Sequence, residues 1–342
     1  MENREGVFNK IRQFWGRLMH VRWLLPALLG LVFLASLVIH HFDLLDLYVQ
    51  LVLMYVGINI ILALSLNLIN GYMGEFSVGH AGFMAVGAYI ASWLTVKVFP
   101  VHLTACLFPL AVLAGGIGAA LVGLIVAFPS FKTRGDYLAI VTLAFGMIVK
   151  SAIENIDVLG GPRGFLGMEK LSTLPWVFFW AALSVWAIRN IVYSNFGRGV
   201  LSIREDEIAS DLMSVNTKEV KIIVFVVSSF FAGIAGALFA HLLQFISPRA
   251  FDIIKSTDIL IMVYLGGIGS IAGSILGATI YTVLLEVLRP MGVWRMVLMP
   301  LMLVMLMIFR PRGIMGLKEF SWFIPVRDIF ASIRWREKRG GR

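Results

Sequence analysis

Long apolar runs alternate with short polar segments along nearly the whole of this chain of 342 residues. A helix of roughly 20 apolar residues crosses a hydrocarbon core of about 30 Å. Candidate crossings lie at 22–40, 47–69, 79–97, 103–128, 137–153, 174–192, 219–245, 258–288 and 293–309. The pattern therefore predicts an all-α polytopic membrane protein.

Glycine interrupts the apolar pattern in both halves of the chain. The stretch 67–89 contains five glycines together with Glu75 and His80, and the run 258–288 contains GGIGS. Non-helical backbone at membrane depth is tolerated only where protein or a water-filled cavity surrounds it, and such segments in both halves indicate a transport path. The run 258–288 is also too long for one simple crossing. We predict a broken or re-entrant segment or two short helices there, and eight to ten transmembrane helices in all.

Small residues at four-residue spacing predict close packing between helices, because they let two backbones approach each other in lipid. Three sets have this spacing: Gly115, Ala119 and Gly123; Ala232, Gly236 and Ala240; and Gly269, Gly273 and Gly277.

The polar run 197–221 is the longest between the two ends of the chain, and it is predicted to form a short amphipathic helix. Ser202 and Glu205 have the spacing of a capping box, which would begin the helix at the next residue, and Asn216 with Glu219 could cap the following apolar run. The residues expected to share one helical face are Leu201, Ile208, Leu212 and Val215. Such a helix is either an ordinary loop packed on its own protein or a docking helix for a soluble partner.

Basic residues determine the expected orientation. Five Lys and Arg lie in 1–22 and nine lie in 310–342. By the positive-inside rule, the two terminal segments and the loop 197–221 face the cytoplasm. The terminal segments flank a transmembrane domain at 23–309. Because both ends lie on the same side, the number of crossings is even. Anionic headgroups of the lipid bilayer are therefore the expected partner of the +9 net charge, and nucleic acid is not.

Composition supports the membrane interpretation and narrows the chemistry. Hydrophobic residues make up 59% of the chain and charged residues 14%, with a mean hydropathy of +0.88. The sequence contains no GxxxxGKS or GxxxxGKT phosphate loop and no Ser/His/Asp arrangement, and its single cysteine, Cys106, allows no internal disulfide. We expect neither enzymatic activity nor a cofactor or metal on this chain.

Four polar residues in the first Gly-interrupted stretch are candidates for the substrate path: Asn67, Glu75, Ser77 and His80. An ionisable group at membrane depth is costly and often functional. The alternative for Glu75 and His80 is that each caps a half-helix or bonds to backbone groups freed by the break.

Five segments of the chain, in order, resemble the LivM-type permease subunit of branched-chain amino-acid ABC importers. They are SLNLINGYMGEFSVGHAGFMAVGAY at 65–89, TRGDYLAIVTLAFGMIV at 133–149, the long segment 196–240, YLGGIGSIAGSILGA at 264–278 and FRPRGIMGL at 309–317. The chain departs from the family pattern at Glu75, where Gln is common, at Ser214, where Gly is common, and at Ser274, where Pro is frequent.

The resemblance implies a permease domain at 23–309 that imports branched-chain amino acids by alternating access. It implies a homologous second permease, two cytoplasmic ATPase subunits that bind ATP and Mg²⁺, and an extracytoplasmic substrate-binding protein, all at the inner membrane of a bacterium. It also implies that the loop 197–221 contains a coupling helix that fits a cleft on the ATPase. The contacts would come from Arg204, Glu205, Asp206, Glu207, Ile208, Ala209, Asp211 and Leu212.

Two other readings stay open at this point. A permease of the same architecture could carry urea or short amides, since substrate choice depends largely on the binding protein. A secondary transporter or channel would need no ATPase, and the amphipathic loop and the scarcity of intramembrane charge pairs argue against it.

Overall fold

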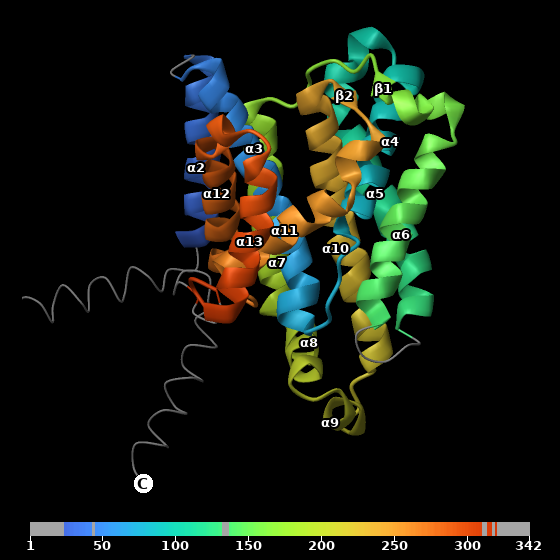
Figure 1. The fold of residues 1–342 in the computed structure, drawn as a ribbon, viewed down its shortest axis with the longest axis vertical. Helices are drawn as coiled ribbons and strands as arrows, with labels where there is room; N and C mark the ends of the chain where they lie inside the picture. Colours follow the sequence, from blue (N-terminus) through green and yellow to red (C-terminus); the bar gives the residue numbers. More distant parts are fainter. Residues whose placement is uncertain (1–23, 43–44, 132–136, 310–312, 317–318, 320–342) are drawn as a thin grey trace, which may run out of the picture.

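The computed structural model describes residues 24–42, 45–131, 137–309, 313–316 and 319. The predicted segment 1–22 and nearly all of 310–342 lie outside the described residues. Within them the chain is a helical bundle with a small antiparallel pairing of β1 (Phe165–Leu166) with β2 (Phe245–Ile246), in which Phe165 faces Ile246 (Figure 1).

Each predicted run corresponds to a helix or to a pair of helices. The first half contains α2 (Leu24–His41), α3 (Leu47–Asn67), α4 (His80–Trp93), α5 (Thr104–Ser130) and α6 (Tyr137–Glu154). The second half contains α7 (Leu174–Val192), α8 (Asn195–Glu205), α9 (Glu207–Leu212), α10 (Thr217–Leu243), α11 (Ile253–Gly266), α12 (Ile271–Val287) and α13 (Trp294–Phe309). Short 3-10 turns connect them at Val101–Leu103, Asp157–Leu159, Gly161–Arg163, Pro248–Phe251 and Arg289–Met291.

Both Gly-interrupted segments are breaks in helical structure. The α3 helix continues into a wider π-turn, η1 (Leu68–Met73), which ends at Gly74 with φ +81°, and an extended stretch leads to α4. The run 258–288 is divided into α11 and α12, and the hydroxyl of Ser270 caps α12 by accepting from the Gly273 N–H at 2.9 Å. Glycine suits these positions because Gly74 and Gly269 both have positive φ.

By length and composition, five of the described helices can cross a membrane, or six if α6 and the bent segment after it form one span. The α11, α12 and α13 helices have only 14, 17 and 16 residues. The protein is thus an all-α, multi-pass membrane protein, and the total of eight to ten crossings stays a prediction.

Small residues bring α10 against α4 and α5 at the centre of the bundle. A Cβ on Gly236 of α10 would lie 1.9 Å from the Met84 carbonyl oxygen, and one on Gly87 of α4 would lie 2.2 Å from the Gly233 carbonyl oxygen. In the second half Gly277 has the same role, since its Cβ would lie 2.0 Å from the Met262 carbonyl oxygen of α11. Gly269 does not share that helix face, because it lies in the turn between α11 and α12.

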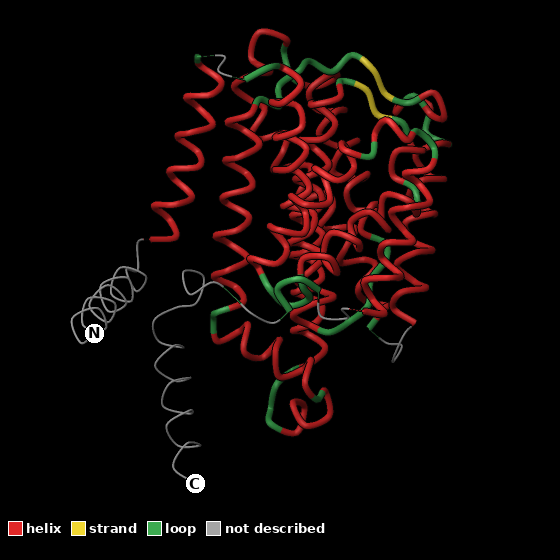
Figure 2. The backbone as a smooth tube through the Cα atoms, turned by 60° about the vertical axis from the view of Figure 1, so that its left-hand side comes forward, coloured by secondary structure: helices red, strands yellow, loops and turns green. Residues whose placement is uncertain are grey.

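The connecting segments lie at two opposite ends of the bundle. The β1–β2 pair is at one end, and α8 and α9 project from the other (Figures 1 and 2). This arrangement places the loop after α6 and the loop 197–221 at opposite ends of the bundle. Which end faces the cytoplasm stays a prediction.

Candidate functional site

The polar run 197–221 folds into two short helices and not into one. Ser194 caps α8 by accepting from the Gly197 N–H at 3.1 Å, and Asp206 caps α9 by accepting from the Ala209 N–H at 3.0 Å. The predicted capping box at Ser202 is wrong: Ser202 lies inside α8, where its hydroxyl donates to the Gly199 carbonyl. Asp206 has an extended backbone (φ −160°, ψ 111°), which ends α8. Its carboxylate then begins α9, because Asp is favoured as a helix N-cap.

The break at Asp206 also changes the predicted apolar face. Leu201 and Val215 are half-buried, whereas Ile208 and Leu212 on α9 are 74% and 82% exposed. The four residues therefore do not form one buried stripe. Instead Ile208 and Leu212, one helical turn apart, form an exposed apolar ridge on α9, an arrangement typical of an interaction surface.

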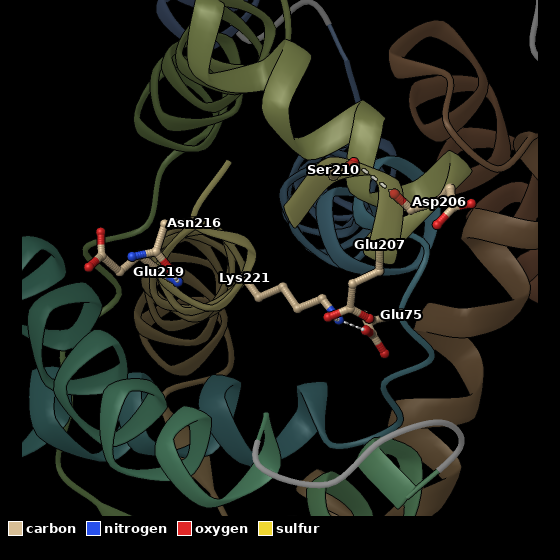
Figure 3. A network of polar contacts seen from close by, with 7 residues as sticks. All are labelled: Glu75, Asp206, Glu207, Ser210, Asn216, Glu219 and Lys221. Carbon is tan, nitrogen blue, oxygen red and sulfur yellow. Dashed lines mark hydrogen bonds and ion pairs between the residues drawn. The ribbon is translucent and has the colours of Figure 1, made fainter. Parts of the chain in front are cut away.

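A buried cation joins α9 to the membrane domain. The ammonium of Lys221, in the second turn of α10, lies 2.6 Å from Glu75 Oε1 and 2.8 Å from Glu207 Oε1, and its side chain is 8% exposed. Figure 3 shows Lys221 extending from α10 to the two carboxylates. Asn216 caps α10 through the Glu219 N–H at 3.2 Å, as the sequence predicts. One lysine therefore ties Glu207 of α9 to Glu75 in the first break.

A second contact joins α8 to the same break. The Arg204 guanidinium donates to the Gly71 carbonyl at 2.9 Å. The backbone of Gly74 lies directly against the Arg204 side chain, since a Cβ there would lie 2.9 Å from Arg204 Cγ. The first break is thus held from the α8–α9 side at two points.

The two breaks are joined to each other by Asn67, the last residue of α3. Its amide donates to the Ser270 carbonyl at 2.9 Å and to Ser274 Oγ at 2.7 Å, and its Oδ1 accepts from the Gly269 N–H at 2.9 Å. Asn67 is fully buried. Asn67 thus satisfies the Gly269 N–H in the turn between α11 and α12 and adds a donor to the Ser270 carbonyl, which also accepts from Ser274.

The end of the described chain closes the second break. The Ile314 N–H donates to the Leu265 carbonyl at 3.0 Å, and the Met315 N–H donates to the Gly266 carbonyl at 2.9 Å. The Glu319 carboxylate accepts from the N–H groups of Ile271 and Ala272 at the start of α12, and from the Tyr72 hydroxyl at 3.2 Å. Burial raises the pKa of Glu319, while these hydrogen bonds oppose the shift. No periodic or spacing signal in the sequence points to this role.

The other path candidates lie inside the packed interior. The Ser77 N–H donates to Asn70 Oδ1 at 3.1 Å, and the Ser77 hydroxyl is buried without a partner among the described residues. His80, the first residue of α4, is fully buried, with Nε2 2.7 Å from Ser65 Oγ and with Nδ1 unpartnered in the described part of the chain. Asn67 binds backbone groups, and Glu75 binds Lys221. Contact with substrate stays a prediction for all four candidates.

Comparisons with known proteins extend over most of the chain. A family described as "Branched-chain amino acid transport system / permease component" matches residues 48–309. The high-affinity branched-chain amino acid transport system permease protein LivM of Escherichia coli K12 is 33% identical over 293 residues, covering 75% of this chain and 68% of the relative. LivH of Salmonella typhimurium is 22% identical over 287 residues, covering 76% and 91%. The ribose import permease RbsC of Haemophilus influenzae is 24% identical over 246 residues, covering 67% and 73%. No solved structure matches.

Proposed function

The chain belongs to the family of branched-chain amino acid transport permease components, on its LivM side, and we propose that it is one membrane subunit of an ATP-driven importer of leucine, isoleucine and valine. It forms the translocation path with a homologous second permease in a bacterial inner membrane, with both termini in the cytoplasm. Two ATPase subunits carry ATP and Mg²⁺, and an extracytoplasmic binding protein delivers the amino acid.

The observation that carries the ATP-driven reading is the α8–α9 unit. Its tip exposes Ile208 and Leu212, and its base is fastened to the first break through Lys221 and Arg204. An exposed apolar ridge with acidic neighbours suits insertion into a cleft of a soluble subunit. The proposed contact set is Arg204, Glu205, Asp206, Glu207, Ile208, Ala209, Asp211 and Leu212.

The contacts suggest how movement of the ATPases reaches the path. ATP binding closes the ATPase pair and displaces α9, and Glu207 transfers that displacement to Lys221 and Glu75. The movement of the first break then reaches the second break through the hydrogen bonds of Asn67. No covalent chemistry occurs on this chain, and access alternates because tightly packed helices shift between two discrete arrangements.

The test is reconstitution of the purified complex, made by co-expressing this chain with its second permease and ATPases, in proteoliposomes with the binding protein. We expect uptake of radiolabelled leucine that requires ATP, and that isoleucine and valine inhibit while urea does not. Uptake that this chain supports alone without ATP would overturn the importer assignment. Uptake of urea in place of leucine would overturn the substrate.

A further inference from the structure

A cavity of about 420 Å³ lies between α3, α11, α12 and α13. Its volume is within the roughly 300–1,000 Å³ typical of small-molecule sites. The α12 and α13 helices, which contribute Glu286 and Arg295 to the wall, are joined toward the end of the bundle away from α9 (Figure 1). None of the residues predicted for the substrate path lines this cavity.

Charged groups of both signs line this one cavity. Lys255 and Asp258 come from α11, Glu286 from α12 and Arg295 from α13. Asp258 accepts from the Tyr281 hydroxyl, and Glu286 pairs with Arg289, which does not line the cavity, at 3.0 Å. Neither Lys255 nor Arg295 forms an ion pair within the described part of the chain. Lys255 lies 5.5 Å from the centroid of the Phe239 ring, and both cations interact electrostatically with Asp258. The cavity therefore holds two cations that lack a direct contact with a carboxylate.

A buried amide of α3 also lies at this wall. Asn59 of α3 is 4% exposed and lines the cavity, and its amide donates to Thr282 Oγ1 at 2.9 Å. Its Oδ1 has no hydrogen-bond partner among the described residues. Asn59 therefore adds a buried amide to the wall beside the charged groups, while its Oδ1 itself has almost no accessible surface.

The rest of the wall is apolar. Leu285, Met299 and Pro300 line the cavity beside Ile253 and Ile254. A ligand that matches this wall carries a negative group, a positive group with N–H donors, and an aliphatic portion. Urea and short amides have no charges to pair with the four ionisable residues.

We infer that this cavity is a binding subsite for a zwitterionic amino acid with an aliphatic side chain. Arg295 and Lys255 bind its carboxylate, Asp258 binds its ammonium, and Leu285 and Met299 contact its side chain. The inference rests on the proposed function, because it names where the permease itself recognises the transported molecule after the binding protein releases it.

The test measures equilibrium binding of radiolabelled leucine to the full permease–ATPase complex in nanodiscs without binding protein. We expect Arg295→Gln and Asp258→Asn each to weaken leucine binding at least tenfold, and Arg295→Lys to weaken it less. Leucinol, which lacks the carboxylate, should compete poorly with leucine on the wild type, and Arg295→Gln should narrow that difference. The matched control is Arg163→Gln, which removes an exposed arginine of the loop after α6, outside the cavity, and should change binding less than twofold.

The same variants are assayed for ATP-driven leucine uptake and for complex assembly by size-exclusion chromatography. Assembled Arg295→Gln and Asp258→Asn complexes that bind and transport leucine like the wild type would overturn this subsite while the importer assignment stands. If a variant fails to assemble, the leucinol comparison on the wild type decides: equal competition by leucinol and leucine excludes recognition of the carboxylate. A wild-type complex without leucine uptake would instead overturn the proposed function.

Discussion

At the scale of single residues, Lys221 is the point where three parts of the molecule meet. It is buried near the start of α10, and its two acidic partners come from α9 and from the first break. A buried cation is costly without a carboxylate partner, and removal of this cation leaves two like charges near each other. Movement of α9 therefore changes the environment of Glu75 directly.

We predict that Lys221→Met uncouples the complex without preventing its insertion. Substrate-stimulated ATPase activity should fall at least tenfold, because Glu207 and Glu75 then repel each other, and Lys221→Arg should retain part of it. The measurement is ATP hydrolysis by reconstituted complexes with and without leucine-loaded binding protein. Lys218→Met, which removes an exposed lysine of the same helix, is the control and should leave stimulation intact. Normal stimulation in Lys221→Met would contradict the link.

At the scale of elements, the α8–α9 unit combines a fixed base with an exposed tip. The base is fixed by Arg204 and Lys221, whereas Ile208, Leu212 and Met213 at the tip are each at least 74% exposed. Exposed apolar residues contribute little to the stability of the chain that carries them, so their substitution tests partner contact without disturbing the fold.

The double variant Ile208→Ser with Leu212→Ser should lose the ATPase subunits. We expect at least a tenfold drop in the amount of ATPase that co-purifies with the chain, because two apolar side chains leave the contact, and a change in melting temperature of less than 2 °C, roughly the effect of half a kcal/mol. Val158→Ser changes a residue that is 64% exposed in the loop after α6, away from the proposed interface, and should leave co-purification unchanged. Undiminished recovery with the double variant would exclude this ridge as the docking surface.

At the scale of the whole molecule, α10 holds the first half of the bundle together. It begins at the coupling unit and packs along α4 and α5 through glycine and alanine. In lipid such contacts rest on van der Waals packing and close backbone approach, because burial of apolar groups supplies no hydrophobic driving force there. A larger side chain at one of these glycine or alanine contacts should therefore push α10 away from α4 or α5.

A pair of identical substitutions tests that packing. Gly236→Ala places a Cβ 1.9 Å from the Met84 carbonyl oxygen, so we expect the melting temperature of the purified chain to fall by at least 4 °C, about 1–2 kcal/mol. Gly30→Ala in α2 meets no atom within 4 Å and should be neutral or stabilise by up to about 1 kcal/mol through helix propensity. Equal melting temperatures for the two variants would contradict a tight contact between α10 and α4 at Gly236.

Local sequence patterns alone determined much of this molecule. Apolar runs specify which residues face lipid or the bundle interior, and the polar run 197–221 had to lie outside the membrane because lipid offers its backbone and charges no partners. Glycine clusters predicted both breaks, and Asn216 was identified as a cap because capping involves residues only three positions apart. The exceptions are also local: Asp206, and not Ser202, begins a helix, which divides the predicted one into two.

Only the tertiary structure decided which polar groups meet. Glu75 and Lys221 are 146 positions apart, Asn67 and Gly269 are 202 apart, and Glu319 joins α12 from beyond α13. A buried polar group must find a partner inside the protein, but which partner it finds depends on where the packed helices place their ends. For the same reason the sequence does not reveal the cavity lined by Asn59, Asp258 and Arg295. These residues come from three helices, and no regular spacing in the sequence connects them. The hydrophobic pattern of the sequence indicates whether a residue lies in the membrane or in water. Which residues it contacts depends on how the whole bundle packs.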